Sequence, residues 1–120
     1  VAAGDLNSDG SADLIAGGGP NGGPRVRIVD GFSLLSSQDA DSSQLASFFA
    51  GDPNTRGGVR VAARFVDGDP VPDIITGSGS NVPSEVRVYH ATSVLGNSSP
   101  SAASTFDPFG AVLADGVYVG

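Results

Sequence analysis

Carboxylate and amide side chains recur at alternate positions in the segment GDLNSDGSADL, residues 4–14. An alternate spacing turns successive oxygens towards one point of a tight loop, and calcium loops gather their oxygen ligands in this way. Gly10, directly after the third such side chain, permits the sharp turn that the loop needs, where φ can be positive. We therefore predict a calcium site whose ligands come from Asp5, Asn7, Asp9, the main-chain carbonyl of Ser11, and Asp13.

The spacing does not continue as an EF-hand would require. An EF-hand has a glutamate at its twelfth position, where this chain has Ala16, and it needs a helix on each side of the loop. The alternative is a polar β-turn, because Asx turns alone favour the sequence Asn-Ser-Asp-Gly. Three acids within nine residues repel each other unless a cation lies among them, and this repulsion favours the metal site.

The chain contains an internal repeat. Residues 1–30 align with residues 61–90 without a gap and share 11 of 30 positions, whereas about two identities are expected by chance. The final segment DGVYVG, residues 115–120, also resembles GGVRVA at residues 57–62. The sequence therefore predicts two units, 1–60 and 61–120, that together make one fragment of a repeat protein.

The second unit carries an incomplete copy of the acidic loop. Asp67, Asp69 and Asp73 occupy the places of three of the predicted ligands. Phe65 stands where the first carboxylate would be, and Pro70 replaces the turn glycine and stiffens the loop. Two interpretations remain open: a weak metal site, or a structural turn held by Asx hydrogen bonds.

Each unit is predicted to form four short antiparallel strands, and the fold class is all-β. Alternation of polar and apolar residues is clearest in RVRIV and EVRVY. We expect strands within residues 1–4, 12–19, 24–31 and 44–51, and within 59–65, 72–79, 84–90 and 103–109. The serine-rich stretches 33–43 and 93–103 are expected to be surface loops.

A repeated four-stranded unit of this kind is typical of a β-propeller blade. Two blades cannot close a ring, and repeat architectures generally need three or more units. We therefore expect either further blades in the same chain or a homo-oligomer that completes the propeller.

The segments GDLNSDGSADLIAGGG and GPRVRIVDG, with LASFFAGDPNTRGGVRVAA after them, resemble the FG-GAP repeat of integrin-α-like β-propellers in its bacterial secreted form. The resemblance covers nearly the whole chain and is most specific over residues 4–31. It implies a propeller that binds calcium in the hairpin loop between the first two strands of a blade. It also implies an extracellular or cell-surface location and a role in recognition or adhesion.

Composition excludes several classes of protein. The net charge is −7, and the six basic residues are all arginines, so the chain lacks the basic footprint of a nucleic-acid binder. There is no cysteine, which excludes disulfides and thiol catalysis. The glycine-rich GGGPNGGP is no phosphate loop, because the chain contains no lysine. No run approaches the length of a membrane span, so we expect no membrane insertion.

Two further groups of side chains could have either a structural or a ligand-binding role. Three arginines on one strand face either pair with neighbouring carboxylates or form a binding surface for an acidic glycan or protein: Arg25, Arg27 and Arg87. Four phenylalanines either pack between blades, which we favour, or form an exposed aromatic platform: Phe48, Phe49, Phe106 and Phe109.

Catalysis is disfavoured. His90 is the only histidine, no G-x-S-x-G elbow accompanies it, and its counterpart in the first unit is Asp30, so we predict a polar strand-end position. The clustered acids lie at metal-ligand rather than glycosidase spacing. We expect a calcium-stabilised, non-catalytic scaffold that binds an unidentified protein or carbohydrate. The alternatives are an ancillary substrate-binding domain of a secreted hydrolase or lyase, and a self-assembling structural unit.

Overall fold

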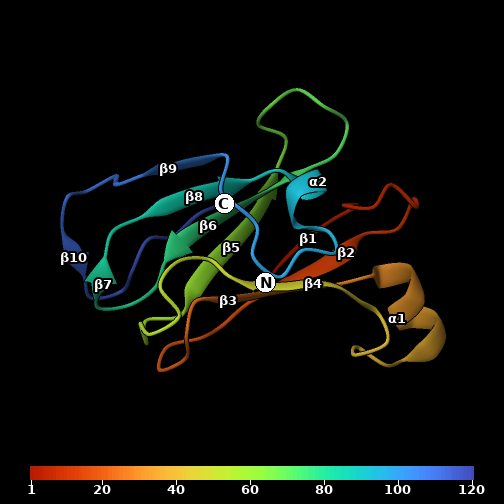
Figure 1. The fold of residues 1–120 in the computed structure, drawn as a ribbon, viewed down its shortest axis with the longest axis horizontal. Coiled ribbons are helices and arrows are strands. Elements are labelled where there is room, and N and C mark those ends of the chain that lie inside the picture. Colours follow the sequence, from red (N-terminus) through yellow and green to blue (C-terminus); the bar gives the residue numbers. More distant parts are fainter.

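The chain folds into two four-stranded antiparallel sheets, and the computed structural model describes all 120 residues (Figure 1). The first sheet has the order β1-β2-β3-β4, with strands Ala2–Gly4, Asp13–Gly17, Arg25–Val29 and Gln44–Phe49. The second sheet has the order β5-β6-β8-β9, with strands Val59–Arg64, Asp73–Ser78, Val86–Tyr89 and Ser104–Phe106. All eight strands lie within their predicted ranges, and the all-β prediction is confirmed. Neither sheet closes on itself.

Two short helices and a small ribbon were not predicted. Helix α1, Gly31–Ser37, follows β3, and helix α2, Ala91–Val94, follows β8, so the stretches 33–43 and 93–103 are not loops throughout. Strand β7, Val82–Pro83, pairs with β10, Val112–Leu113, at the end of the molecule away from the helices (Figure 1). Neither helix has the length and apolar character needed to cross a membrane.

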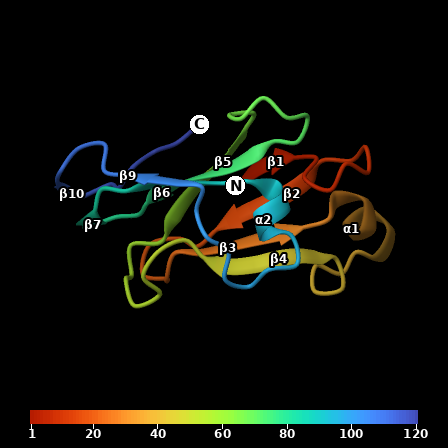
Figure 2. The same cartoon turned by 45° about the horizontal axis from the view of Figure 1, so that its top comes forward.

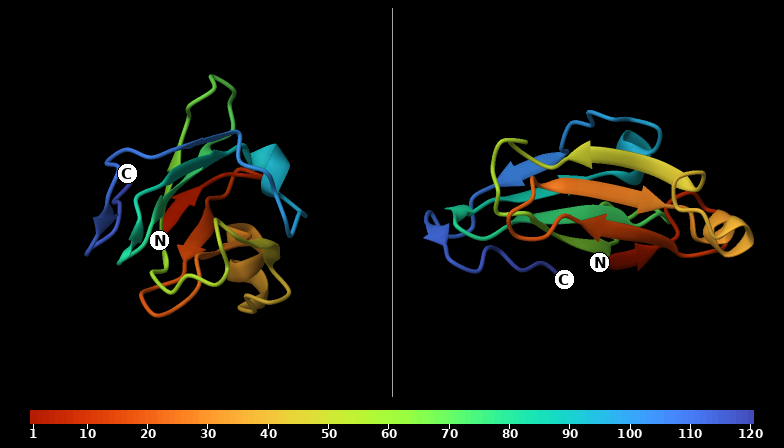
Figure 3. Two further views of the ribbon diagram at one scale, coloured as in Figure 1. Left: turned by 60° about the vertical axis from the view of Figure 1, so that its left-hand side comes forward. Right: turned by 90° about the horizontal axis from the view of Figure 1, so that it is seen from below.

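The two sheets pack face to face around one apolar core (Figures 2 and 3). Alternation along the strands of the first sheet buries one face and leaves the other exposed. The buried face supplies four side chains to the core, Ile15, Val26, Ile28 and Phe48. The facing side of the second sheet supplies Val59, Ala63, Ile74 and Tyr89. The rings of Phe48 and Tyr89 are 5.1 Å apart, in a tilted contact between the sheets.

The chain crosses the two sheets in the same way at two places. Val59 passes over Gly17, where a Cβ atom would come within 2.5 Å of the Val59 carbonyl oxygen. Val117 passes over Gly77, where a Cβ atom would come within 2.3 Å of the Val117 oxygen. The N–H of Val59 donates to the oxygen of Gly18, and that of Val117 to the oxygen of Ser78, both at 2.8 Å. Residues 116–119 thus lie on the second sheet as the start of β5 lies on the first.

The four predicted core phenylalanines behave differently. Phe48 is buried between the sheets, as expected. Phe49 is exposed because it follows Phe48 on the same strand and therefore points to the opposite face. Phe106 and Phe109 are also exposed, since Phe106 lies on the face of the second sheet that no other sheet covers and Phe109 lies beyond the end of β9. The prediction of core packing is therefore wrong for three of the four.

Candidate functional site

The first acidic loop, Asp5–Asp13, joins β1 to β2 and is folded around its own side chains. The N–H of Asp9 donates to the carboxylate of Asp5 and to the amide oxygen of Asn7, at 3.1 Å in both cases. The N–H of Gly10 donates to the other Asp5 oxygen at 2.9 Å. Gly10 has φ of 88°, as predicted for the sharp turn. Asp5 and Asn7 therefore bind the loop backbone.

Three carboxylates converge at the end of this loop. One oxygen each from Asp9, Asp13 and Asp30 lies within 4.8 Å of the others. Asp30 was not predicted as a ligand, although it directly follows β3, beside the start of β2. The pairing of Leu14 with Val29 makes Asp13 and Asp30 neighbours across the sheet. The sequence signal that was available is the match of Asp30 with His90 at the same place in the repeat.

The environments of Asp13 and Asp30 differ. Asp13 is fully buried, and its oxygens accept hydrogen bonds from the N–H groups of Leu6 at 2.9 Å and Gly31 at 3.1 Å. Burial raises the pKa of Asp13 above its usual value, against the opposing effect of these hydrogen bonds. Asp30 caps helix α1, and the hydroxyl of Ser33 donates to it and lowers its pKa.

The three carboxylates suit a hard divalent cation. Calcium–oxygen distances are about 2.3–2.6 Å, so two oxygens on one ion lie at most about 5 Å apart. The three oxygens lie within 4.8 Å of one another, which meets this limit without movement of the backbone. Asp9 and Asp13 are predicted ligands that the structure brings together. The N–H of Ser11 donates to Asp9 at 2.8 Å, so this backbone turn helps to hold the Asp9 carboxylate.

The second acidic loop, Phe65–Asp73, gathers a different set of groups. The Nδ1 atom of His90 lies 2.9 Å from an oxygen of Asp73 and 3.1 Å from an oxygen of Asp67. The hydrogen bond to Asp73 is the main reason that the pKa of His90 is raised. Asp69 instead accepts from the N–H of Val71 at 2.8 Å. The imidazole of His90 thus lies between two of the three predicted ligands, where its protonated form can neutralise them. One ligand atom each from Asp67, Asp73 and His90 also lies within 4.8 Å of the others, so these three groups could hold a metal ion as well.

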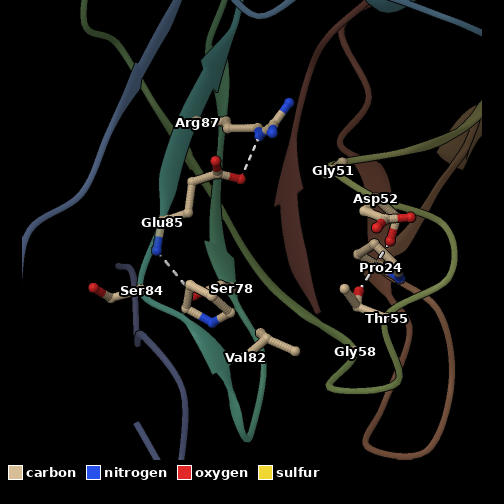
Figure 4. A pocket seen from close by; sticks show the side chains of 12 residues that line it. Pro24, Gly51, Asp52, Thr55, Gly58, Ser78, Val82, Ser84, Glu85 and Arg87 are labelled. Carbon is tan, nitrogen blue, oxygen red and sulfur yellow. Dashed lines mark hydrogen bonds and ion pairs between the residues drawn. The ribbon is translucent and has the colours of Figure 1, made fainter. Parts of the chain in front are cut away.

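A pocket of about 370 Å³ opens between the two sheets, at the ends of the strands remote from the acidic loops (Figure 4). Glu85 and Arg87 form one wall, with Arg87 Nε 2.6 Å from Glu85 Oε1. Asp52 and Thr55 stand on the opposite side, on the chain segment between β4 and β5 (Figure 4). Ser78 accepts the N–H of Glu85 at 3.0 Å. The pocket thus combines apolar surface with a few polar side chains that a small hydroxyl-bearing ligand could bind.

The arginines bind nearby acceptors. Arg27 contacts Asp41 at 2.5 Å, and Arg87 contacts Glu85. The Nε atom of Arg25 donates to the hydroxyl of Ser47 at 2.8 Å. Pairing with neighbouring carboxylates is therefore correct for two of the three arginines. It leaves little free positive charge for an acidic ligand on that strand face.

Comparison with known proteins identified no similar protein. No protein-family model, no curated protein and no solved structure matches the chain.

Proposed function

We propose that this chain is a two-blade segment of an extracellular, FG-GAP-like β-propeller, which acts as a non-catalytic scaffold for binding or adhesion. The observation that carries the proposal is the repeat of one sheet with one strand order, each copy with an acidic loop in its first hairpin. The two copies stack face to face, which is how neighbouring blades of a propeller bury their apolar sides.

Calcium stabilises the scaffold at the first acidic loop in this proposal. Asp9, Asp13 and Asp30 would hold the ion, which supplies positive charge that offsets their mutual repulsion and the burial of Asp13. The ion would join the β1–β2 loop to the end of β3 and so stiffen the rim of the first sheet. Extracellular modules bind calcium with dissociation constants of about 10⁻⁴–10⁻³ M, in keeping with an extracellular location.

The ligand is a protein or a glycan, and the pocket between the sheets favours a neutral glycan. The carboxylates of Asp52 and Glu85 can accept hydrogen bonds from sugar hydroxyls, and Arg87 can donate to their oxygens. A non-catalytic role is supported by His90, because no serine or threonine hydroxyl is hydrogen-bonded to its ring, whose Nδ1 contacts Asp73 and Asp67.

Binding of neutral oligosaccharides tests the proposal. Saturation-transfer NMR with a panel of neutral oligosaccharides should show a bound sugar with the wild-type chain. Glu85→Ala should weaken it about tenfold or more, since a hydrogen bond to a charged group contributes roughly 1.5–3 kcal/mol. Asp41→Ala is the matched control, because Asp41 pairs with Arg27 as Glu85 pairs with Arg87 but lies outside the pocket.

Two outcomes would contradict this assignment. Absence of binding across the panel would remove the neutral-glycan ligand. Equal effects of Glu85→Ala and Asp41→Ala would show that the pocket is not where the sugar binds.

A further inference from the structure

The second sheet carries an apolar cluster that repeats the buried cluster of the first sheet. We define the outer face of the second sheet by four residues, Ile75, Val86, Val88 and Phe106. Ile75 pairs with Val88, and Val86 pairs with Phe106, on neighbouring strands. The same register joins the four core residues of the first sheet, in which Ile15 pairs with Ile28 and Val26 pairs with Phe48.

The two clusters differ in what covers them. The four residues of the first sheet are at most 2% exposed, because the second sheet packs on them. On the outer face Val86 is buried, Ile75 and Val88 are half-buried, and Phe106 is 50% exposed. Residues 116–119 cover the part of this face around Gly77, which pairs with Val86. The outer face therefore has the pattern of a sheet-to-sheet interface without its second sheet.

A complementary surface lies on the first sheet. Its front face exposes Ala3, Leu14 and Ala16. Their counterparts in the second sheet are Ala63, Ile74 and Thr76, which lie on the side that packs on the first sheet. The register agrees as well, since Ala3 pairs with Leu14 as Ala63 pairs with Ile74. Leu14 is 40% exposed, whereas Ile74 is fully buried.

The edge strand β1 of the first sheet also has a counterpart in the second sheet. Strand β1, Ala2–Gly4, corresponds to the second half of β5, Ala62–Arg64. Residues 117–119 correspond to its first half, as their crossing of Gly77 shows. Residues 117–119 therefore lie on the outer face as the start of β5 lies on the first sheet, and a first sheet docked there would place its β1 beside them.

We infer that the outer face of the second sheet binds the front face of the first sheet of a second copy of this chain, head to tail. The inference rests on the blade packing of the proposed function, and it needs neither calcium nor the glycan. The contact is heterologous, so each bound copy presents a fresh outer face, and assembly continues until a ring closes. The partner is a second copy because its front face repeats, in register, the surface of the second sheet that already packs on the first-sheet cluster.

Sedimentation of two single variants and their mixture tests the inference. The wild-type chain should sediment as a species heavier than its 11.9 kDa monomer. Leu14→Asp breaks the front face and Phe106→Asp breaks the outer face, and each variant alone should be monomeric. An equimolar mixture retains one intact interface, and it should give a dimer of twice the monomer mass and nothing larger. Leu35→Asp, at an 83% exposed residue on α1, is the control and should assemble like the wild type.

Several results would overturn the inference. The first is a wild-type chain that stays monomeric up to millimolar concentration, because the outer face would then not bind a second copy. Self-association of Leu14→Asp would indicate an outer-face-to-outer-face contact, and failure of the two folded variants to pair would exclude the head-to-tail contact. Circular dichroism establishes that both variants are folded. Running the series in calcium and in chelator separates the claims: assembly in both supports the inference even if the calcium proposal fails.

Discussion

The two acidic loops each place carboxylates close together, but they differ in the groups that surround these negative charges. The first brings together three carboxylates, from Asp9, Asp13 and Asp30, whereas the second brings together two carboxylates and the imidazole of His90. The decisive difference is the residue at the end of the third strand, Asp30 in one copy and His90 in the other. In the proposed function the first loop takes its cation from solution, whereas in the second loop the imidazole of His90 lies between the two carboxylates. The proposal thus makes one copy of the repeat depend on metal and the other not.

The two sheets differ in a similar way. The same apolar cluster, in the same register, is fully covered in the first sheet and only partly covered in the second. From sequence similarity alone, both clusters would be expected to contribute equally to the free energy of unfolding. The first cluster should contribute more, because apolar side chains stabilise the fold only where their surface is removed from water.

The largest expected effect contrasts Ile15 with Ile75, which are identical residues at equivalent positions. Ile15→Ala should lower the free energy of unfolding by about 2–5 kcal/mol, because it leaves a cavity between the sheets. Ile75→Ala should cost less than half as much in dilute monomer, since Ile75 is only half-buried. Urea unfolding measures both. Equal losses would contradict the contrast between the covered and the uncovered cluster.

A smaller effect is expected from exchange of the residues that end the third strands. With 10 mM calcium and a dissociation constant of about 10⁻⁴–10⁻³ M, the wild-type chain should gain about 1.4–2.7 kcal/mol over chelator. Asp30→His should remove most of this gain, because the imidazole replaces one of the three carboxylates. His90→Asp should lower stability in chelator and add a second calcium response. Thermal melting in calcium and in chelator checks both. An unchanged response in Asp30→His would count against the site.

The smallest effect is the pH dependence of the second loop. Because Asp73 and Asp67 raise the pKa of His90 above its usual 6.5, the folded state holds this proton more tightly than the unfolded state. This contribution to stability is full below about pH 6.5 and is lost as pH rises through the raised value. In chelator, the wild-type urea midpoint should therefore fall more than that of His90→Asn as the pH rises above about 6.5. Parallel profiles would show that the imidazole is not the counter-ion.

The strands were predictable because each unit alternates polar and apolar residues, and because the repeat gave every strand a second copy. The helices were not, since α1 has only seven residues and its SLLSS segment shows no helical period over several turns. A local signal did exist: Asp30 caps α1 through the N–H of Phe32 and the hydroxyl of Ser33. The β7–β10 ribbon joins two-residue strands about 30 residues apart, a length at which alternation carries no information.

The acidic loop was predictable from local spacing, but its closing carboxylate was not. Asp30 reaches the site through the lateral pairing of β2 with β3, which a reading of consecutive residues does not contain. The roles of Asp5 and Asn7 also depend on three-dimensional structure, because only the folded loop shows that their oxygens bind the backbone. Which phenylalanines are buried likewise depends on which sheet face is covered.

The most direct test of the account is calcium stoichiometry, measured by isothermal titration calorimetry with the wild-type chain, Asp9→Ala and Asp69→Ala. The account predicts one ion per wild-type chain, no binding by Asp9→Ala, and one ion per chain with Asp69→Ala, because only the first loop lacks an internal cation. Two ions per wild-type chain would show that His90 does not neutralise the second loop. No binding at millimolar calcium would contradict the metal site altogether.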